Sequence, residues 1–274
     1  MIGRRAVIGL ALLSALLFSA FAAQSASAAK AVNTTGVTCV KVVDHGDFYD
    51  EHCDVKVAPG DTTGKYTHQN YAGSTEVTAT NSAVTEETKK SEPAVLKSKV
   101  GLTPTEITCT VVENEPKNSV IKNEEPAAGQ HAVSGTVRTL FKTCTVNKPE
   151  KCKVAEPITS NAKFTAVEKL GAGANEMGGE LVGSGAEETF AEITFEGAEC
   201  ALKGKTFKVK GSVIGTSGPG TEEPQTNKWS GATTVFTAKK EMEKLKLGVE
   251  VAEFSTIVTP RGPSGAPLSG TTPT

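Results

Sequence analysis

The sequence predicts an all-β fold, an antiparallel β-sandwich or barrel-like structure stapled by disulfides. Three observations support this prediction: Thr and Val fill most of the patterned segments, apolar and polar residues alternate with a period of two, and the chain has six cysteines. Thr and Val are β-branched, which suits a pleated sheet better than a helix. Alternation with a period of two indicates strands with one buried and one solvated face, as in antiparallel sheets.

Three segments carry the alternation most clearly: 137–142, 207–213 and 245–251. Each has apolar residues on one face of the expected strand and mostly polar residues on the other. In the second segment, Gly211 interrupts the apolar face. The stretch 238–247 is composed of good helix formers, so a single helical turn is the rival interpretation there.

Residues 1–28 predict a secretory signal peptide. A basic segment, Met1–Arg5, precedes an apolar run over 6–23, and Ala26-Ser27-Ala28 offers a cleavage site. The alternative is a retained anchor, because the run is close to the length of about 20 residues that spans a bilayer. The small residues at its exit favour cleavage. No second apolar run follows, so we expect a mature chain without a transmembrane helix, secreted to the extracellular side or loosely associated with the cell wall.

Composition divides the rest of the chain into three expected parts. A charged stretch over Thr85–Pro93 suggests a boundary, with a small N-terminal β module over 29–100 that holds a Cys39–Cys53 hairpin. The main β-sandwich domain is expected over 101–259. Residues 260–274 are rich in Pro, Gly, Ser and Thr, which predicts a disordered tail.

An even number of cysteines in an exported chain is typical of disulfides. The six are Cys39, Cys53, Cys109, Cys144, Cys152 and Cys200. Zinc and redox sites normally need closely spaced C-x-x-C pairs, which do not occur in the sequence. About 15 connectivities are formally possible. Proximity along the chain suggests Cys39–Cys53 and Cys144–Cys152, which leaves Cys109–Cys200.

Three stretches together carry a resemblance to a known group of proteins. They are CVKVV to GDFYDEHC over 39–53, FKTCTV to CKVAEPITSN over 141–161, and FAEITFEGAEC to FKVKGSVIG over 190–215. In this order the chain resembles an uncharacterised family of secreted, cysteine-containing β-rich proteins of soil actinobacteria. The resemblance implies secretion and a β architecture, and it implies no activity or catalytic residue.

Charge excludes some classes of partner. The chain has 29 basic and 31 acidic residues, and without Arg4 and Arg5 of the leader the balance is 27 to 31. A near-neutral chain lacks the chain-wide positive footprint of nucleic-acid or anionic-membrane binding, so we expect no nucleic-acid partner. With 22% charged residues and a mean hydropathy of −0.20, the chain is not a disordered polymer.

The densest cluster of potential metal ligands lies over 44–54, around Cys53. Its candidate ligands are Asp44, His45, Asp47, Asp50 and His52. Closely spaced carboxylates suit calcium, and the histidines suit a transition metal. The spacing lacks the ligand rhythm of an EF-hand loop, so the alternative is a solvated, acidic hairpin tip. Our main interpretation therefore assigns no metal and no cofactor.

The sequence contains no G-x-S-x-G or H-E-x-x-H motif, and we assign no catalytic residue. Trp229 is the only tryptophan, and its ring either stacks on a sugar or a partner or belongs to the core. We predict a secreted, non-catalytic protein with a binding or structural role at or outside the cell surface. Its expected partner is a cell-wall or extracellular glycan, or a protein. The alternatives are a carbohydrate-active hydrolase with an Asp/Glu pair and a metal-binding module on hairpin 44–54.

Overall fold

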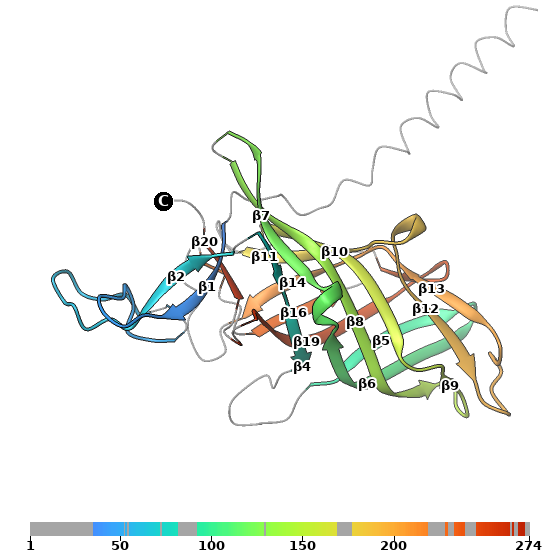
Figure 1. The fold of residues 1–274 in the computed structure, drawn as a ribbon. Coiled ribbons are helices and arrows are strands. Elements are labelled where there is room, and N and C mark those ends of the chain that lie inside the picture. Colours follow the sequence, from blue (N-terminus) through green and yellow to red (C-terminus); the bar gives the residue numbers. More distant parts are fainter. Residues whose placement is uncertain are drawn as a thin grey trace, which may run out of the picture. The chain divides into compact units, whose positions relative to one another are not determined.

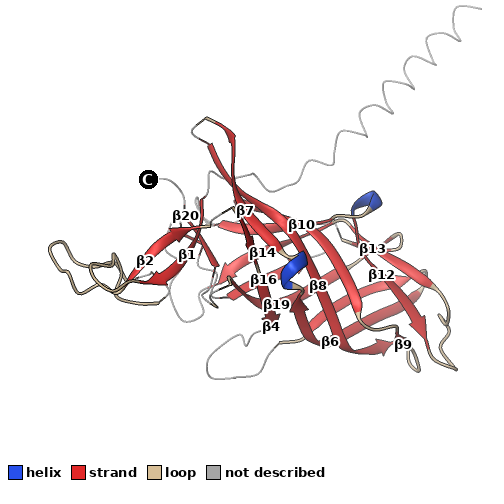
Figure 2. Ribbon diagram, in the orientation of Figure 1, coloured by secondary structure: helices blue, strands red, loops and turns tan. Residues whose placement is uncertain are grey.

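Antiparallel strands form nearly all of the secondary structure, which confirms the predicted all-β class (Figure 2). The computed structural model describes residues 35–51, 53, 55–71, 73–81, 92–128, 130–168, 177–218, 228–229, 233–238, 245–263, 265 and 268–271. Within these ranges the only helical elements are two single turns of 3-10 helix, Pro116–Asn118 and Ala186–Glu188. The predicted signal peptide lies outside the described residues.

The largest sheet has eleven strands within the described ranges, in the order β3-β7-β8-β10-β11-β14-β16-β19-β4-β6-β5. Their bounds are β3 (Ser74–Glu76), β4 (Thr78–Asn81), β5 (Ala94–Val100), β6 (Thr103–Asn114), β7 (Val120–Ala127), β8 (Gln130–Lys148), β10 (Ile158–Glu168), β11 (Met177–Gly183), β14 (Ser212–Gly218), β16 (Thr233–Ala238) and β19 (Glu253–Arg261). Strand β8 is long enough, at 19 residues, to pair with β7 near its start and with β6 near its end.

Two additional pairings close this sheet on itself. Strand β8 pairs with β10 on one side and with β6 on the other, so these three strands run side by side (Figure 1). Strand β19 pairs with β16 and also with β5, where Glu253 faces Lys97. In the described part of the chain, β8, β10, β11, β14, β16, β19, β5 and β6 therefore form a closed antiparallel ring of eight strands. Closure gives the barrel-like form of the predicted fold.

A second sheet packs on the ring. Its order is β18-β17-β13-β12-β9. The bounds are β9 (Lys153–Val154), β12 (Thr189–Glu196), β13 (Thr206–Lys210), β17 (Lys246–Leu247) and β18 (Glu250–Val251). Phe195 and Leu247, at 0% and 1% exposure, share one apolar cluster with Ile107 and Val112 of the ring. The two sheets thus bury their apolar faces against each other, as in a sandwich.

Gly211 marks the point where the chain passes from one sheet to the other. The predicted strand over 207–213 is divided there between β13 and β14, and Gly211 has a φ of 106°, which a residue with a Cβ rarely adopts. The segment 245–251 also differs from its prediction as one strand. It forms the short hairpin β17–β18, because Gly248 reverses the chain with a φ of 66°. Residues 239–244 of the possible helical turn lie outside the described residues.

The third sheet joins both ends of the described chain. Its order is β15-β20-β1-β2, with bounds β1 (Thr35–Lys41), β2 (Tyr66–Asn70), β15 (Lys228–Trp229) and β20 (Leu268–Thr271). The amide side chain of Asn123, on β7, accepts a hydrogen bond from Gly36 N (2.6 Å) and donates one to Gly36 O (3.0 Å). These two bonds fix the third sheet to the largest one.

The expected division of the chain is corrected in two places. Strand β5, expected in an N-terminal module ending at residue 100, pairs with β6 along its whole length, and residues 31–274 form one compact unit. The tail expected to be disordered contributes the end of β19 and all of β20. Leu268 is only 1% exposed, so the burial of this one apolar side chain stabilises the C-terminal strand.

All six cysteines form disulfides, as predicted, but two of the three pairings differ. Cys39–Cys53 is confirmed. Instead of Cys144–Cys152 and Cys109–Cys200, the chain forms Cys109–Cys144 and Cys152–Cys200. The reason is strand register: Cys109 on β6 lies directly opposite Cys144 on β8, with 4.0 Å between their Cα atoms. Cys152 and Cys200 flank the paired strands β9 and β12, 4.5 Å apart.

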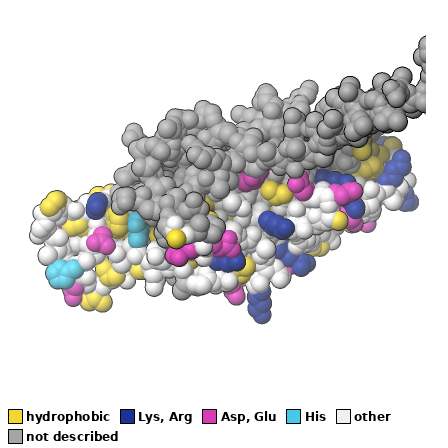
Figure 3. Space-filling view, turned by 90° about the horizontal axis from the view of Figure 1, so that it is seen from above, with side chains coloured by type: hydrophobic (Ala, Val, Ile, Leu, Met, Phe, Trp, Pro, Cys, Tyr) yellow, Lys and Arg dark blue, Asp and Glu magenta, His cyan; other side chains and the backbone are white. Residues whose placement is uncertain are grey.

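The described surface carries both signs of charge. Figure 3 shows basic and acidic side chains interspersed over the face that it presents, in keeping with the near-neutral balance of the sequence. Neither of the helical turns in the described ranges has the length and apolar character needed to cross a bilayer.

Candidate functional site

The interior of the strand ring contains a cavity of about 150 Å³. Of the 28 described residues that line it, all are apolar except Asn114, Thr139, Ser160 and Thr256. Strand alternation explains this composition. On β19, Phe254, Thr256 and Val258 line the cavity, whereas Glu253 and Ser255, on the opposite face of the strand, are exposed.

Apolar clusters cover the cavity towards both ends of β8. Near the start of β8, Val133 belongs to a cluster with Tyr71 and Leu268 of the N- and C-terminal segments. Near its end, Val146 belongs to the cluster of the second sheet, which includes Phe195. Residues of both clusters line the cavity, and Ile193 and Val209 of the second sheet belong to its lining. The space therefore lies between the inner face of the ring and the second sheet.

Close packing around a glycine sets the position of one aromatic wall residue. Phe164, on β10, lines the cavity and is 5% exposed. A Cβ on Gly179 of the neighbouring strand β11 would lie 2.3 Å from Cε2 of the Phe164 ring. Glycine at this position therefore leaves room for the Phe164 side chain beside β11.

The polar groups of the wall fall into two kinds. Thr139 Oγ1 donates a hydrogen bond of 2.9 Å to Asn114 Oδ1, so these two side chains satisfy each other across β8 and β6. Thr256 is 5% exposed, and its hydroxyl has no hydrogen-bond partner among the described residues. In the ring, three strands separate β19 from β10 in either direction, so Thr256 and Ser160 lie on opposite walls.

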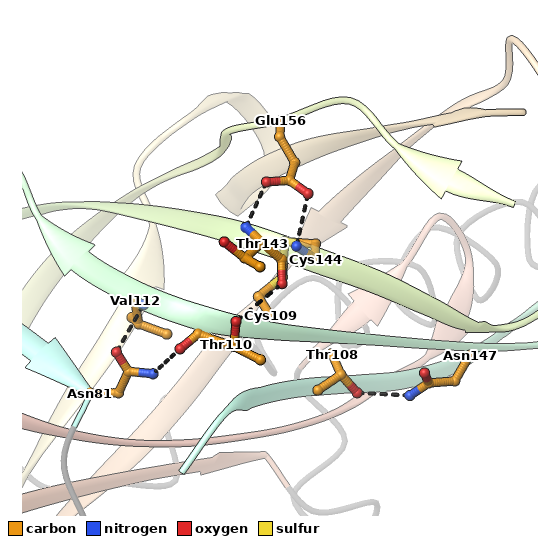
Figure 4. Close-up of a disulfide and its surroundings, with 9 residues drawn as sticks. All are labelled: Asn81, Thr108, Cys109, Thr110, Val112, Thr143, Cys144, Asn147 and Glu156. Carbon is orange, nitrogen blue, oxygen red and sulfur yellow. Dashed lines mark hydrogen bonds between the residues drawn. A yellow bond between two sulfur atoms is a disulfide. The ribbon is translucent and has the colours of Figure 1, made fainter. Parts of the chain in front are cut away.

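A disulfide and its surroundings reinforce the wall where β6 meets β8 (Figure 4). Cys109 lines the cavity, and its partner Cys144 follows Thr143, which has a φ of 52°. The carboxylate of Glu156 accepts hydrogen bonds from the backbone N–H groups of Thr143 (2.6 Å) and Cys144 (2.8 Å). Strand β10 begins only at Ile158, so Glu156 supplies acceptors that a neighbouring strand does not provide at this point.

The acidic hairpin uses its carboxylates within the loop. Asp47 Oδ2 accepts a hydrogen bond from Thr67 Oγ1, and Asp50 Oδ1 accepts one from the backbone N–H of Val55, each at 2.6 Å. Asp44 and His45 are exposed, and His52 lies outside the described residues. Among the residues that the structure describes, no three potential ligands gather closely enough to hold a metal ion.

Another pair of residues in this segment, Tyr49 and Asp61, has shifted pKa values. Tyr49 donates its hydroxyl to Asp61, and this hydrogen bond raises the pKa of Tyr49 and lowers that of Asp61. Both groups lie at the surface, with Tyr49 38% exposed, so the pair braces the loop surface and does not form a buried acid–base site.

Trp229, the predicted binding surface, lies on β15 opposite Gly270. Its side chain lies outside what the structure describes, so its role stays a prediction. The residues that sequence reasoning missed are the polar wall residues, above all Thr256. The signal for it was present, because Phe254, Thr256 and Val258 alternate in an apolar pattern that a hydroxyl interrupts.

The fold and the cavity together define an all-β, disulfide-bonded protein with an apolar chamber inside a closed ring of strands. Comparison of the chain with known protein families, with curated proteins and with solved structures finds no match.

Proposed function

We propose that the protein is an exported, non-catalytic binding protein that holds a small apolar molecule inside its strand ring. One observation carries this proposal: an interior cavity of about 150 Å³ with 24 apolar residues among its 28 described lining residues. Protein interiors are normally close-packed, with few voids larger than a water molecule. An apolar cavity of about this volume stays dry and is large enough for benzene or xenon.

The disulfides support the proposal that the protein is exported. Three disulfides, with no free cysteine among the six, suit a protein that folds and acts in an oxidising environment. The leader predicted over 1–28 would deliver the chain there. A site at or outside the cell surface would meet small apolar molecules from the surroundings before they reach the cytoplasm. Binding of a glycan or a protein partner stays a prediction.

The first experiment measures binding of benzene to the purified, oxidised protein by thermal unfolding. A ligand that binds only the folded state raises its stability, by about 2.7 kcal/mol at a concentration 100-fold above Kd. We expect a saturable increase in Tm, and recovery of chemically unchanged benzene by mass spectrometry. Conversion of the ligand would contradict the non-catalytic proposal.

A matched pair of variants locates the site. Ala162 lies on β10, is 3% exposed and lines the cavity, whereas Ala201 is exposed in a turn. Ala162→Leu fills part of the cavity and should abolish the benzene-induced increase in Tm, and Ala201→Leu should retain it. Methyl NMR on the unaltered protein provides a test independent of these variants. Benzene should shift the methyl resonances of Leu181 and Val213 and leave that of the exposed Leu102 in place. Absence of these shifts, or shifts confined to the surface, would overturn the proposal.

A further inference from the structure

We infer that the ligand has a neutral, apolar body and one carbonyl oxygen, which accepts hydrogen bonds from a polar row in the cavity wall. The polar row consists of Asn114 on β6, Thr139 on β8 and Ser160 on β10, and all three residues line the cavity. This inference rests on the proposed function and specifies the chemistry of the molecule that the same cavity binds.

The three residues of the polar row lie beside one another at one level of the strand ring. Thr139 is the register partner of Asn114 on one side and of Ser160 on the other. Neighbouring strands lie about 4.8 Å apart, so the row crosses about 10 Å of the wall. The lining residues nearest to the row along these three strands are apolar: Val112, Val137, Phe141, Ile158 and Ala162. The row is therefore a polar band within an apolar part of the wall.

The side chains of the polar row belong to the inner face of the ring. Arg138 precedes Thr139 and Glu115 follows Asn114, and these two charged side chains form a partly exposed ion pair, with 3.1 Å between Arg138 Nε and Glu115 Oε2. On β10, Ile158 and Ala162 lie two positions before and after Ser160, and both line the cavity. Successive side chains of a strand point to opposite faces, so the residues of the row point inward where their charged neighbours point outward.

The polar row has hydrogen-bonding groups that the described chain does not use. The hydrogen bond from Thr139 Oγ1 occupies Asn114 Oδ1 and leaves the two N–H donors of Asn114 Nδ2 without a partner among the described residues. Ser160 Oγ has no described partner either. The fully buried side-chain polar atoms that lack a partner in the described part of the chain are Arg138 Nε and Thr256 Oγ1. Asn114 Nδ2 and Ser160 Oγ are not among them, so both atoms keep accessible surface and are available to a molecule in the cavity.

These groups select for a ligand with an acceptor. The amide of Asn114 can only donate through Nδ2, and the hydroxyl of Ser160 can also donate. A carbonyl oxygen accepts such hydrogen bonds, whereas a ligand without an acceptor would exclude water and leave the donors unpaired, which is unfavourable. None of the described lining residues is charged, so an ionic ligand would lose its hydration without gaining a partner of opposite charge. The wall therefore favours a neutral compound whose single carbonyl group lies at the polar row.

The test compares cyclohexanone with methylenecyclohexane, which have the same ring and differ in a C=O against a C=CH₂ group. Asn114→Leu replaces the amide by an apolar group of similar volume, and Ser160→Ala removes the hydroxyl. The controls are Asn70→Leu on β2 and Ser74→Ala on β3, the same replacements at exposed positions. Calorimetry on the purified, oxidised protein gives the ratio of the Kd for methylenecyclohexane to the Kd for cyclohexanone.

We expect this ratio to fall about five-fold in Asn114→Leu and about two-fold in Ser160→Ala, because the carbonyl oxygen loses a donor, and to be retained in both controls. Affinity for methylenecyclohexane should not decrease in any variant. NMR of the unaltered protein gives a readout that does not depend on the folding of a variant. Cyclohexanone should shift the side-chain amide resonances of Asn114 more than methylenecyclohexane does, and should leave those of Asn70 in place.

The outcomes separate this inference from the proposed function. If both compounds bind but the ratio is the same in Asn114→Leu and Ser160→Ala, or if benzene binds and cyclohexanone does not, the inference is wrong and the proposed function stands. Asn114 amide shifts that are equal for the two compounds would overturn the inference in the same way. If neither these compounds nor benzene binds the unaltered protein, the proposed function fails together with the inference.

Discussion

Removal of the Cys152–Cys200 disulfide tests the connectivity of the fold directly. This bond closes a loop with a sequence separation of 48. In the loop-entropy treatment, such a cross-link stabilises the folded state by about 4.1 kcal/mol, against about 3.8 for the separation of 35 and about 3.0 for that of 14. We therefore expect the double variant Cys152→Ser/Cys200→Ser to lose about 4 kcal/mol, a large part of the 5–15 kcal/mol typical of folded proteins.

The assay is urea unfolding of the double variant and of each single variant under non-reducing conditions. Because the two sulfur atoms belong to one bond, the second substitution should add little to the first. The pairing suggested by sequence proximity, Cys144–Cys152 and Cys109–Cys200, predicts a different result. There, Cys152 and Cys200 belong to different disulfides, and the double variant would lose both bonds, so the losses of the single variants would add.

Peptide mapping gives the second readout. Trypsin cleaves after Lys151, so it separates the peptide containing Cys144 from the one containing Cys152. The structure requires that Cys152 remain linked to the peptide of Cys200 and Cys144 to that of Cys109. Additive losses of stability, or a linkage between Cys144 and Cys152, would refute the observed register between β6 and β8 as well as the disulfide.

Three further changes have expected outcomes. Phe195→Ala removes a completely buried ring from the cluster between the two sheets and should destabilise the protein by about 3–5 kcal/mol in urea unfolding. The hydrogen bond from Lys210 lowers the pKa of Glu187, so NMR titration should show its carboxylate titrating below the usual range of Glu and moving upward in Lys210→Gln. Stability from this pair is present above the unfolded-state pKa and is lost as pH falls through the folded-state pKa. Gly179→Ala should push the Phe164 ring into the cavity and weaken benzene binding, measured by calorimetry.

Each of these outcomes has a control. Leu102→Ala, at a side chain that is 98% exposed, should change stability by no more than about 0.5 kcal/mol, so a loss comparable to that of Phe195→Ala would contradict the burial argument. Lys205→Gln removes a positive charge at the other end of the β12–β13 hairpin, where Phe195 N donates to Lys205 O, and the titration of Glu187 should then change little. Unaltered benzene affinity in Gly179→Ala would show that Phe164 does not limit the ligand space.

Local sequence patterns predicted the strands well where the whole patterned segment belongs to a single sheet. Val137, Thr139 and Phe141 alternate in the sequence, and in β8 they line the interior as expected. The same reasoning did not divide 207–213 between two sheets. Gly211 signals an interruption, but which strands lie beside each half depends on residues far away in the chain. The hairpin at Gly248 was missed because two residues on each side of a turn are too few to show a period.

The disulfides and the cavity depend on long-range register in the same way. Cys109 and Cys144 are 35 positions apart and meet only because β6 and β8 close the ring. Closure also decides that Thr256 lines a cavity, whereas in an open sheet the same alternation would place it against a packed layer. The sequence pattern could place the Thr256 side chain on the inward face of its strand, but it could not reveal the cavity that this residue lines.

The cavity also has a consequence for the stability of the protein. At about 24 cal/mol per Å³, apolar side chains that filled a volume of about 150 Å³ would stabilise the folded state by at most about 3.6 kcal/mol. Small inward-facing residues, Ala79, Ala94 and Ala162, create this space at positions where larger apolar residues would fill it. If the cavity is a binding site, substitutions that fill it should raise Tm in the absence of ligand and weaken binding in proportion, which is the opposition between stability and function expected at a functional site. If it were only a packing defect, filling it would raise Tm with no loss of any binding, because there would be none to lose.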